Sequence, residues 1–289
     1  NLRLFSFLLF RKRFDIYWSA DIDTGLPLLL LSRIKKSEYW IDLHEIFPEL
    51  PEVARRPLIQ KIWKIVEKIL LKYASKKITI SKSFASYYGI SPQNVIMNVP
   101  VKVTAEVAEI STRKYILYQG WVNEGRGFDH LLLAMQQIAV PLVICGKGNY
   151  FNTVKKMIKE LKIEDRVHLA GWIEPSRLGE FTVSAIIGLT LFDASGLSNY
   201  LSAANRFFDY INYLVPQIAM NYPEYASINK KYNVAILIDN LTTSSLLWAI
   251  KILLENKSLY HQLVENCKKA REEFCWDREK EKLFKLFSY

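Results

Sequence analysis

The segment at residues 197–225 reads LSNYLSAANRFFDYINYLVPQIAMNYPEY, and it decides the fold that we predict. It follows an apolar run at 185–192 that is typical of a buried strand, with turn-forming residues between the two. A helix is predicted from about Ser202, and Pro216 ends it before a short strand at 217–220. The segment therefore reads as one strand–loop–helix–strand unit of an α/β protein.

The start of this predicted helix points free backbone N–H groups at the preceding loop, which makes an anion site beside Asn199 and Tyr200. Asp209 lies two turns into the helix, and Arg206 lies one turn before it on the same side. A carboxylate at this position can accept hydrogen bonds from both hydroxyls of a ribose while the helix start holds a diphosphate. The alternative is an ordinary amphipathic helix with an Arg206–Asp209 pair on its surface.

Composition and length are those of a two-domain globular protein. The chain has 289 residues, of which 50% are hydrophobic and 24% are charged. Three cysteines without a CxxC pair indicate a reducing, cytoplasmic compartment and no zinc site. No apolar run is long enough to span a bilayer. The chain begins at Asn1 and shows few strands in its first third, so we expect that its opening βα units are missing.

The formal net charge of +10 is concentrated between Arg55 and Lys82, where nine basic residues stand against Glu67 alone. A helix is predicted at 58–73 in this region. One side of it carries lysines that would lie on an anionic lipid surface, and the other would pack its apolar residues on the sheet. The alternative is a solvated lysine face, and nucleic acid is disfavoured because no nucleic-acid motif is present. The lysines are Lys61, Lys64, Lys68 and Lys72, and the apolar residues are Ile59, Ile62, Val66, Ile69 and Tyr73.

Strands and helices alternate along the whole chain, which predicts parallel, doubly wound sheets on either side of a polar linker at 101–113. Ligands of such sheets bind at the carboxyl ends of the strands. In the first series, Asp21 and His44 follow two predicted strands. In the second series, the glycine loops at 125–127 and 146–148 follow two more. Glycines such as Gly146 and Gly148 let a backbone approach phosphate, and the guanidinium of Arg126 can bind two phosphate oxygens.

Several of these blocks together resemble glycosyltransferase family 4, in the right order and over nearly the whole chain. The second-domain blocks are YILYQG at 115–120, RG at 126–127, VICGKG at 143–148, VHLAGW at 167–172 and NRFFDY at 205–210. The first-domain blocks are DLHEIFPE at 42–49 and SKS at 81–83.

The resemblance implies a GT-B fold, in which two Rossmann-like, doubly wound domains face a cleft and helices close the chain. It implies an acceptor-side domain at 1–103, a nucleotide-sugar domain at 104–275 and a helix at 276–289 that packs back toward the first domain. Arg126 stands where the family binds the donor diphosphate, and Asp209 stands at the ribose-binding glutamate. Gly120 would let the phosphates approach, while Asn199 and Tyr200 would offer backbone N–H groups. Asp21 and His44 would face the sugar or the acceptor.

Three positions depart from the family pattern. Trp121 stands where the family has an arginine, Leu201 stands at the first acid of the Glu-x7-Glu pattern, and a first-domain histidine is replaced near Ala20. These departures put the donor sugar and the catalytic details in question rather than the fold. The Asp21-Ile22-Asp23 triplet matches a metal–diphosphate motif of another glycosyltransferase fold, and we interpret it as coincidence. No cofactor and no metal are expected.

The sequence thus predicts a retaining glycosyltransferase of cell-surface polysaccharide or glycoconjugate synthesis. It would move a hexose from a nucleoside diphosphate sugar to a glycan or lipid-linked acceptor, in the cytoplasm or peripherally at the inner membrane face. Two alternatives stay open. One is a GT-B nucleotide-sugar epimerase, and the other is a degenerate partner subunit that only binds the donor.

Overall fold

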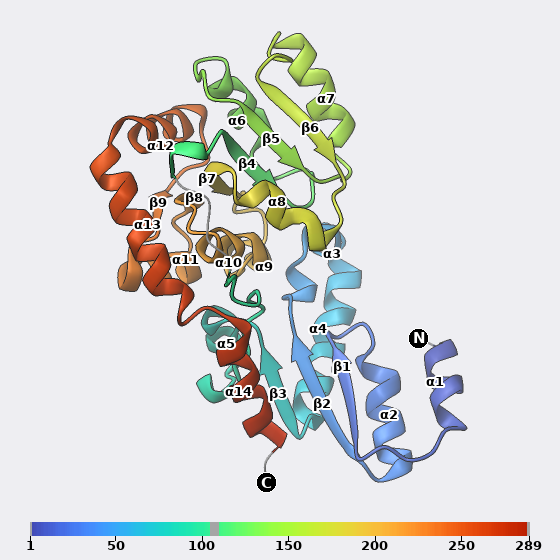
Figure 1. Ribbon diagram of the computed structural model, residues 1–289. Helices are drawn as coiled ribbons and strands as arrows, with labels where there is room; N and C mark the ends of the chain where they lie inside the picture. Colours follow the sequence, from blue (N-terminus) through green and yellow to red (C-terminus); the bar gives the residue numbers. More distant parts are fainter. Residues whose placement is uncertain (1, 105–109, 288–289) are drawn as a thin grey trace. The chain divides into compact units, whose positions relative to one another are not determined.

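The computed structural model describes residues 2–104 and 110–287, which form two compact units (Figure 1). Unit 1 comprises Asn1–Met97, Ala194–Ser202 and Lys280–Tyr289, and unit 2 comprises Asn98–Asp193 and Ala203–Glu279. The domain limits at 103/104 and 275/276 stay predictions, because compactness does not show which segments fold independently.

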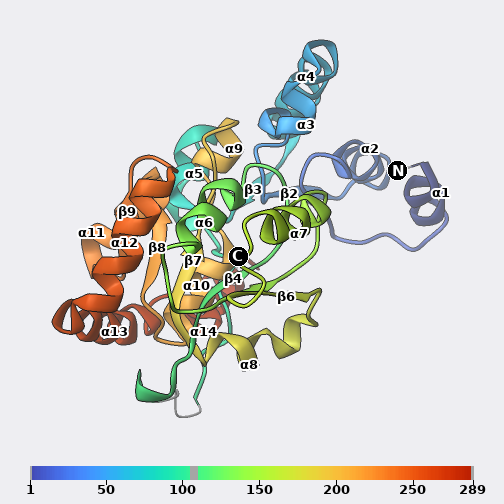
Figure 2. The same ribbon diagram turned by 90° about the horizontal axis from the view of Figure 1, so that it is seen from above.

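Unit 1 is built on a parallel sheet with the strand order β1-β2-β3. Its strands are β1 (Ile16–Ala20), β2 (Glu38–Leu43) and β3 (Lys76–Thr79). Its helices are α1 (Leu2–Leu9), α2 (Gly25–Lys35), η1 (Phe47–Glu49), α3 (Pro51–Ala54), α4 (Pro57–Tyr73), α5 (Lys82–Tyr88), η2 (Pro92–Asn94) and α9 (Leu197–Tyr200). The strand order follows the chain, and parallel crossovers are almost always right-handed, so α2 and α4 are expected on one face of the sheet, where they contact each other (Figure 2).

The other face of this sheet is covered by the last turns of α14 (Trp276–Phe287). Leu286 is buried there against Trp40 and Ile78, and the half-buried Leu283 joins this cluster. The ring of Phe287 lies 4.9 Å from that of Trp40. Side chains alternate between the two faces along β2, which is why Trp40 faces α14 while Tyr39, beside Gly25, faces α2.

Local structure departs from a regular βα pattern at two places. After β3 the chain forms only an isolated bridge between Thr79 and Val95 and then leaves the sheet. The helix predicted from about Ser202 begins at Asn205, and the loop before it contains the short helix α9 that the sequence did not predict.

Unit 2 is a six-stranded parallel sheet with the order β6-β5-β4-β7-β8-β9. Its strands are β4 (Tyr115–Gln119), β5 (Leu142–Cys145), β6 (Val167–Gly171), β7 (Ala185–Thr190), β8 (Gln217–Met220) and β9 (Ala235–Ile238). Its helices are η3 (Ile110–Thr112), α6 (Phe128–Met135), α7 (Phe151–Glu160), η4 (Pro175–Arg177), α8 (Leu178–Thr182), α10 (Asn205–Asn212), α11 (Pro223–Tyr232), α12 (Thr243–Glu255) and α13 (Lys257–Arg271).

The strand order of unit 2 reverses direction between β4 and β7. In the numbering of this sheet alone it is 3-2-1-4-5-6, the order of dinucleotide-binding sheets. Helices therefore leave the carboxyl ends of β4 and β7 toward opposite faces and open a crevice between the two loops. The loops after these two strands are where the candidate site of unit 2 is found.

Helix α10 is held tightly on this sheet. The ring of Tyr210 lies over Gly188 of β7, where an added Cβ would come within 2.5 Å of it, and its hydroxyl donates to the carbonyl of Leu117 at 3.0 Å. Phe207 and Ile211 are fully buried on the same helix. This packing places Arg206 and Asp209 at the carboxyl end of β4.

Candidate functional site

Two guanidinium groups meet at the switch point of unit 2. The guanidinium carbon of Arg126 lies 4.2 Å from the ring centroid of Phe192, and that of Arg206 lies 4.6 Å from the same centroid. Arg206 also stacks on Tyr118 at 4.7 Å and is only 8% exposed. The sequence-based alternative of a surface Arg206–Asp209 pair is wrong, because Arg206 is a core residue. Its Nη1 donates to the carbonyl of Gln119 at 2.9 Å.

These two groups are incompletely satisfied. Among the residues that the structure describes, Nη1 of Arg126 and Nε of Arg206 are buried without a hydrogen-bond partner. Burial lowers the pKa of Arg126, and the like charge of Arg206 lowers it further, whereas Asp193 acts in the opposite direction. Buried donors without acceptors are costly. An anion bound between the two guanidiniums would supply the missing acceptors and offset the like-charge repulsion.

Gly120 lies next to the guanidinium of Arg206 and leaves space beside it. It has φ +124, and a Cβ at this position would lie 3.0 Å from Nη1 of Arg206. Trp121 follows it and is largely exposed, at the position where the resembling family has an arginine. The loop after β4 carries Arg126 but has Trp121 in place of a second arginine. Arg206 brings the second positive charge from α10 instead.

Asp209 is the acidic group of this site. Its Oδ2 accepts a hydrogen bond from Nε2 of Gln119 at 2.8 Å, and the amide oxygen of Gln119 accepts one from the Thr182 hydroxyl at 2.9 Å. Burial raises the pKa of Asp209 to about 6, while the hydrogen bond from Gln119 and the charge of Arg206 act to lower it. The Thr182 contact orients the Gln119 amide so that its NH₂ group faces the carboxylate.

Gly146 and Gly148 have a packing reason for being glycine. A Cβ on Gly146 would lie 1.8 Å from the carbonyl oxygen of Gly120, and one on Gly148 would lie 2.4 Å from that of Val122. The N–H of Gly146 donates to the carbonyl of Gly171 at 2.6 Å. The two glycines therefore hold the β5 loop against the β4 loop, and their direct contact with phosphate stays a prediction.

Asn199 and Tyr200 are separated from the helix that carries Asp209 by residues 201–204, which are not helical. They lie on the four-residue α9 in unit 1, while α10 begins at Asn205 in unit 2. The N–H of Tyr200 donates to the carbonyl of Gly196 at 3.2 Å. The contact of Asn199 or Tyr200 with an anion stays a prediction.

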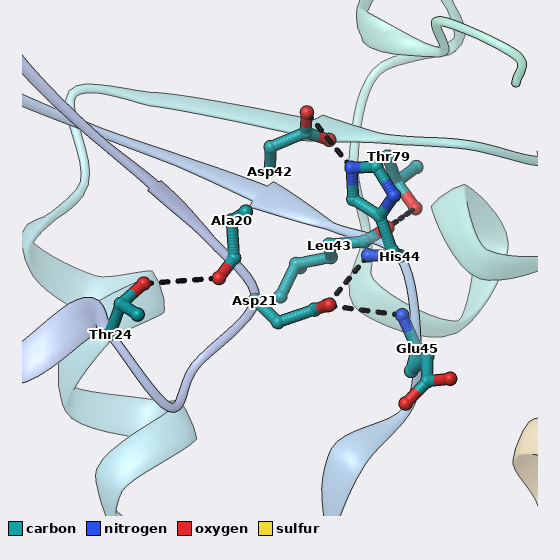
Figure 3. Close-up of polar contacts among 8 residues, drawn as sticks. All are labelled: Ala20, Asp21, Thr24, Asp42, Leu43, His44, Glu45 and Thr79. Carbon is teal, nitrogen blue, oxygen red and sulfur yellow. Dashed lines mark hydrogen bonds and ion pairs between the residues drawn. The ribbon is translucent and has the colours of Figure 1, made fainter.

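In unit 1, Asp21 joins the ends of two strands (Figure 3). It has φ +56, its N–H donates to the carbonyl of Asp42 at 2.7 Å, and its Oδ1 accepts from the N–H groups of His44 (2.7 Å) and Glu45 (3.1 Å). Burial raises its pKa, and these N–H groups act to lower it. The sequence did not predict this bracing of the β2 loop.

The imidazole of His44 is anchored by a second carboxylate, and Figure 3 shows the ring above this loop. Its Nε2 lies 3.1 Å from Oδ2 of Asp42. The hydrogen bond to Asp42 raises the pKa of His44. The ring is partly exposed, so its other nitrogen can exchange a hydrogen bond with a hydroxyl. His44 and Asp21, both predicted from the sequence, therefore lie together, and Asp42 is a partner that we did not predict.

The lysine stripe of α4 differs from its prediction in two ways. Lys64 is paired with Glu49 at 2.7 Å, so its charge is compensated. Of the apolar residues predicted to pack on the sheet, Ile59, Ile62, Ile69 and Tyr73 are exposed and only Val66 is half-buried. The face that packs inward carries Leu70 and Glu67, whose carboxylate accepts from the Tyr88 hydroxyl at 2.8 Å.

The described residues offer neither a metal cluster nor a membrane-spanning helix. No three His, Cys, Asp or Glu side chains there gather as a metal ion would need. In the same part of the chain, no helix combines the length and the apolar character that crossing a bilayer requires.

The sequence analysis missed Gln119, Thr182 and Asp42, and it misjudged Arg206. One signal was available for Gln119, which is a polar residue at the carboxyl end of an otherwise apolar strand. Thr182 acts through a contact across 63 residues of chain and has no local signal, whereas Asp42 stands two residues before His44 in the DLHEIFPE block and could have been found there.

Comparison with known proteins gives a family match over part of the chain. Residues 103–194 match the family model described as glycosyl transferases group 1, which is less than half of the chain. No curated protein matches the sequence.

Solved structures match over nearly the whole chain. HepE of Anabaena, solved with UDP and glucose, has a TM-score of 0.79 at 13% identity, covering 99% of this chain and 80% of its own. Sucrose-phosphate synthase of Thermosynechococcus elongatus has a TM-score of 0.73 at 16% identity, covering 95% and 73%. The lipopolysaccharide outer core galactosyltransferase WaaB has a TM-score of 0.65 at 16% identity, covering 99% and 78%. The predicted fold class is confirmed: the chain has the fold of the GT-B glycosyltransferases, and residues 103–194 carry the glycosyl transferases group 1 sequence pattern.

Proposed function

We propose that this protein is a glycosyltransferase that moves a hexose from a nucleoside diphosphate sugar to a hydroxyl of a glycan or a lipid-linked acceptor. The fold and the group 1 match at residues 103–194 support the class of reaction. The observation that carries the proposal is the pair of incompletely satisfied guanidiniums, Arg126 and Arg206, at the switch point of unit 2.

A diphosphate fits these two groups by charge and by hydrogen-bond count. Each guanidinium presents donors in a planar fork that matches two phosphate oxygens. HepE of Anabaena was solved with UDP, which supports a uridine nucleotide as the first donor to test. Asp209 then provides the acceptor oxygens for the ribose hydroxyls, at the end of the Thr182–Gln119 hydrogen-bond chain.

In the proposed reaction, the bond between the anomeric carbon and the diphosphate oxygen breaks, and the nucleoside diphosphate leaves with the electron pair. Arg126 and Arg206 stabilise the negative charge that grows on this leaving group, which is the largest expected catalytic contribution. The acceptor oxygen bonds to the anomeric carbon and its proton passes to the departing phosphate. Retention of the anomeric configuration is proposed on the resemblance to glycosyltransferase family 4.

Unit 1 is proposed to serve the acceptor and the sugar. His44, held by Asp42, has the geometry to bind a sugar or acceptor hydroxyl through its ring nitrogen. Asp21 contributes indirectly, because it holds the N–H groups of His44 and Glu45 in place. A cytoplasmic location at the inner face of the membrane, in cell-surface polysaccharide or glycoconjugate synthesis, is the setting that we propose.

A panel of nucleoside diphosphate sugars tests this function. A donor should raise the melting temperature of the protein, and the same donor should be consumed to free nucleoside diphosphate when an acceptor is added. A donor that binds but is never consumed would make the protein a binding subunit. Recovery of an isomerised nucleotide sugar would make it an epimerase, and a panel with no thermal shift would contradict the proposal.

Donor binding and turnover are expected to be independent of divalent metal. The described residues hold no metal cluster, and Asp21 of the Asp-x-Asp triplet is engaged with two backbone N–H groups. The measurement is turnover after exhaustive chelation, compared with the same sample after manganese is restored. Activity that is lost with chelator and returns with manganese would contradict this expectation.

Gln119 is expected to act as a positioning residue for Asp209. In Gln119→Leu the carboxylate loses its N–H donor, so its pKa rises and the pH at which donor affinity is half lost moves upward. The measurement is donor affinity across pH by calorimetry.

Gln217→Leu is the matched control for this variant. Gln217 is also buried and also accepts from a threonine, Thr190 at 2.9 Å, but its amide donates to the carbonyl of Phe207 instead of to a carboxylate. A similar loss of stability without a shift of the pH midpoint is expected. If both variants shift the midpoint alike, the Gln119 contact is only structural.

A further inference from the structure

Helix α4 exposes its apolar side. Leu58 is 80% exposed, Ile62 is 60% exposed and Ile65 is 53% exposed, and Ile69 and Tyr73 continue the same line along the helix. These positions recur every three or four residues, so they form one stripe on the outer side of α4. The residues that pack inward lie on the opposite side of the helix.

Helix α2 adds a second apolar stripe beside the first. Leu26, Leu30 and Ile34 are spaced by four residues and are exposed, whereas Leu28, Leu29 and Leu31 of the same helix are buried. The two helices are in contact: the guanidinium of Arg33 lies over the ring of Tyr73 at 5.2 Å and donates to its carbonyl. The two stripes therefore lie on neighbouring helices and adjoin at the C-terminal end of α4.

This surface is flanked by positive charge. Lys61, Lys68 and Lys72 run along one side of the α4 stripe and are exposed, and Arg33 lies between the two helices. The only acid of α4, Glu67, is buried under the helix and accepts a hydrogen bond from Tyr88. A second copy of this chain is a poor occupant, because a symmetric contact would bring the lysine rows together.

We propose that the outer surface of α2 and α4, defined by Leu26, Leu30, Ile34, Leu58, Ile62, Ile65 and Ile69, docks on an anionic lipid bilayer with its aliphatic side chains inserted between the headgroups. Lysine side chains beside an apolar stripe extend their ammonium groups to lipid phosphates while their stems lie on the acyl region. The contact thus combines apolar burial with electrostatic attraction, and it is more than the purely electrostatic contact predicted from the lysines alone. It rests on the membrane location in the proposed function and deepens it, because it names the surface that binds lipid.

Vesicle co-sedimentation tests the surface. The parent protein should sediment with vesicles of phosphatidylcholine and phosphatidylglycerol, and less with phosphatidylcholine alone. Ile62→Glu combined with Ile65→Glu should abolish sedimentation with both, because each places a carboxylate in the apolar stripe. Trp248→Glu is the matched control: Trp248 is an equally exposed apolar residue on α12 of unit 2, and its replacement should change nothing.

The lysines are tested separately. Lys61→Gln, Lys68→Gln and Lys72→Gln together should lower binding to the anionic vesicles by about fivefold per lysine at low salt, with little effect on neutral vesicles. Lys64 is left in place because it pairs with Glu49. Unchanged sedimentation of the isoleucine variant, or equal binding of the parent to both vesicle types, would overturn the proposal.

A site-specific label gives an independent readout. The three native cysteines, Cys145, Cys267 and Cys275, are all buried, so Ile65→Cys can be labelled selectively with an environment-sensitive fluorophore. The emission should shift to the blue on anionic vesicles, and the same label at Trp248→Cys should not respond. An unshifted label at position 65 would overturn the proposal. Sedimentation velocity without lipid gives a second contradicting result: a dimer of the parent protein that the isoleucine variant abolishes would also overturn the proposal. Either result would leave the donor-binding tests of the proposed function unaffected.

Discussion

Replacing Arg206 with methionine is expected to weaken binding of a nucleoside diphosphate by about 1.5–3 kcal/mol, the scale of a charge-assisted hydrogen bond. The reason is that Arg206 brings a buried guanidinium with an unpartnered Nε to the switch point of unit 2, beside Arg126. Arg126→Ala should cost a similar amount. Calorimetric titration of the folded variants measures both.

The same replacement should leave the stability of the free protein unchanged or raise it. Without a ligand, Arg206 and Arg126 are like charges beside the same ring, and each has a buried N–H group without an acceptor, which opposes folding. A variant with a higher melting temperature and weaker binding of the nucleotide sugar therefore identifies Arg206 as a binding residue. A variant that unfolds, or one that binds as tightly as the parent, would show that Arg206 is a structural residue of the core.

A double-mutant cycle makes the test sharper. If Arg126 and Arg206 bind the same diphosphate, the loss of binding free energy in the double variant should differ measurably from the sum of the losses in the two single variants. Arg113 is a matched control, because it is also a buried arginine of unit 2, but it donates to the Tyr260 hydroxyl at 2.9 Å and not to the candidate site. Arg113→Met should affect stability and leave donor affinity as it was.

Donor affinity is expected to fall about tenfold between pH 7 and pH 5, following the ionisation of Asp209. Burial holds the pKa of this carboxyl at about 6, above its ordinary value. The carboxylate that accepts the ribose hydroxyls is therefore present above pH 6 and is lost as the pH falls through 6. A nucleoside diphosphate sugar is the suitable ligand, because its diphosphate carries no proton that titrates in this range.

Asp209→Asn serves as the control for this pH dependence. It should bind the donor weakly at every pH, since an amide offers one acceptor oxygen in place of two. Asp209→Glu should retain binding. A parent protein whose affinity is flat from pH 7 to pH 5, or an Asn variant as tight as the parent, would show that Asp209 does not contact the ribose.

Much of the fold could be predicted from local patterns. Alternating apolar runs and helical periods predicted the parallel α/β sheets, because those patterns arise from the burial of each element alone. The glycine loop before Arg126 and the position of Asp209 on a helix after β7 were also readable, since each depends on a few consecutive residues. Ligand binding at carboxyl ends of parallel strands then followed from topology.

Other features depended on contacts between distant residues. Periodicity showed which residues of α4 share a side. Both sides of this helix are partly apolar, so periodicity did not show which side packs on the sheet. Glu67 turns inward because Tyr88 satisfies its carboxylate, so the isoleucine stripe faces out. The break before α10 had a similar cause, because Leu197 and Leu201 pack with Ile46 in unit 1, away from the core of α10.

The sequence by itself thus determined the parallel, doubly wound sheets and two of the groups of the candidate site, Arg126 and Asp209. Only the tertiary structure decided that Arg206 belongs to that site, because its neighbours Tyr118 and Phe192 lie on β4 and in the loop after β7. It also decided that Gln119 holds Asp209 and that Asp21 braces the loop of His44. The physical reason is the same in each case. Hydrogen bonds and ring contacts between residues far apart in the chain leave no local pattern in the sequence.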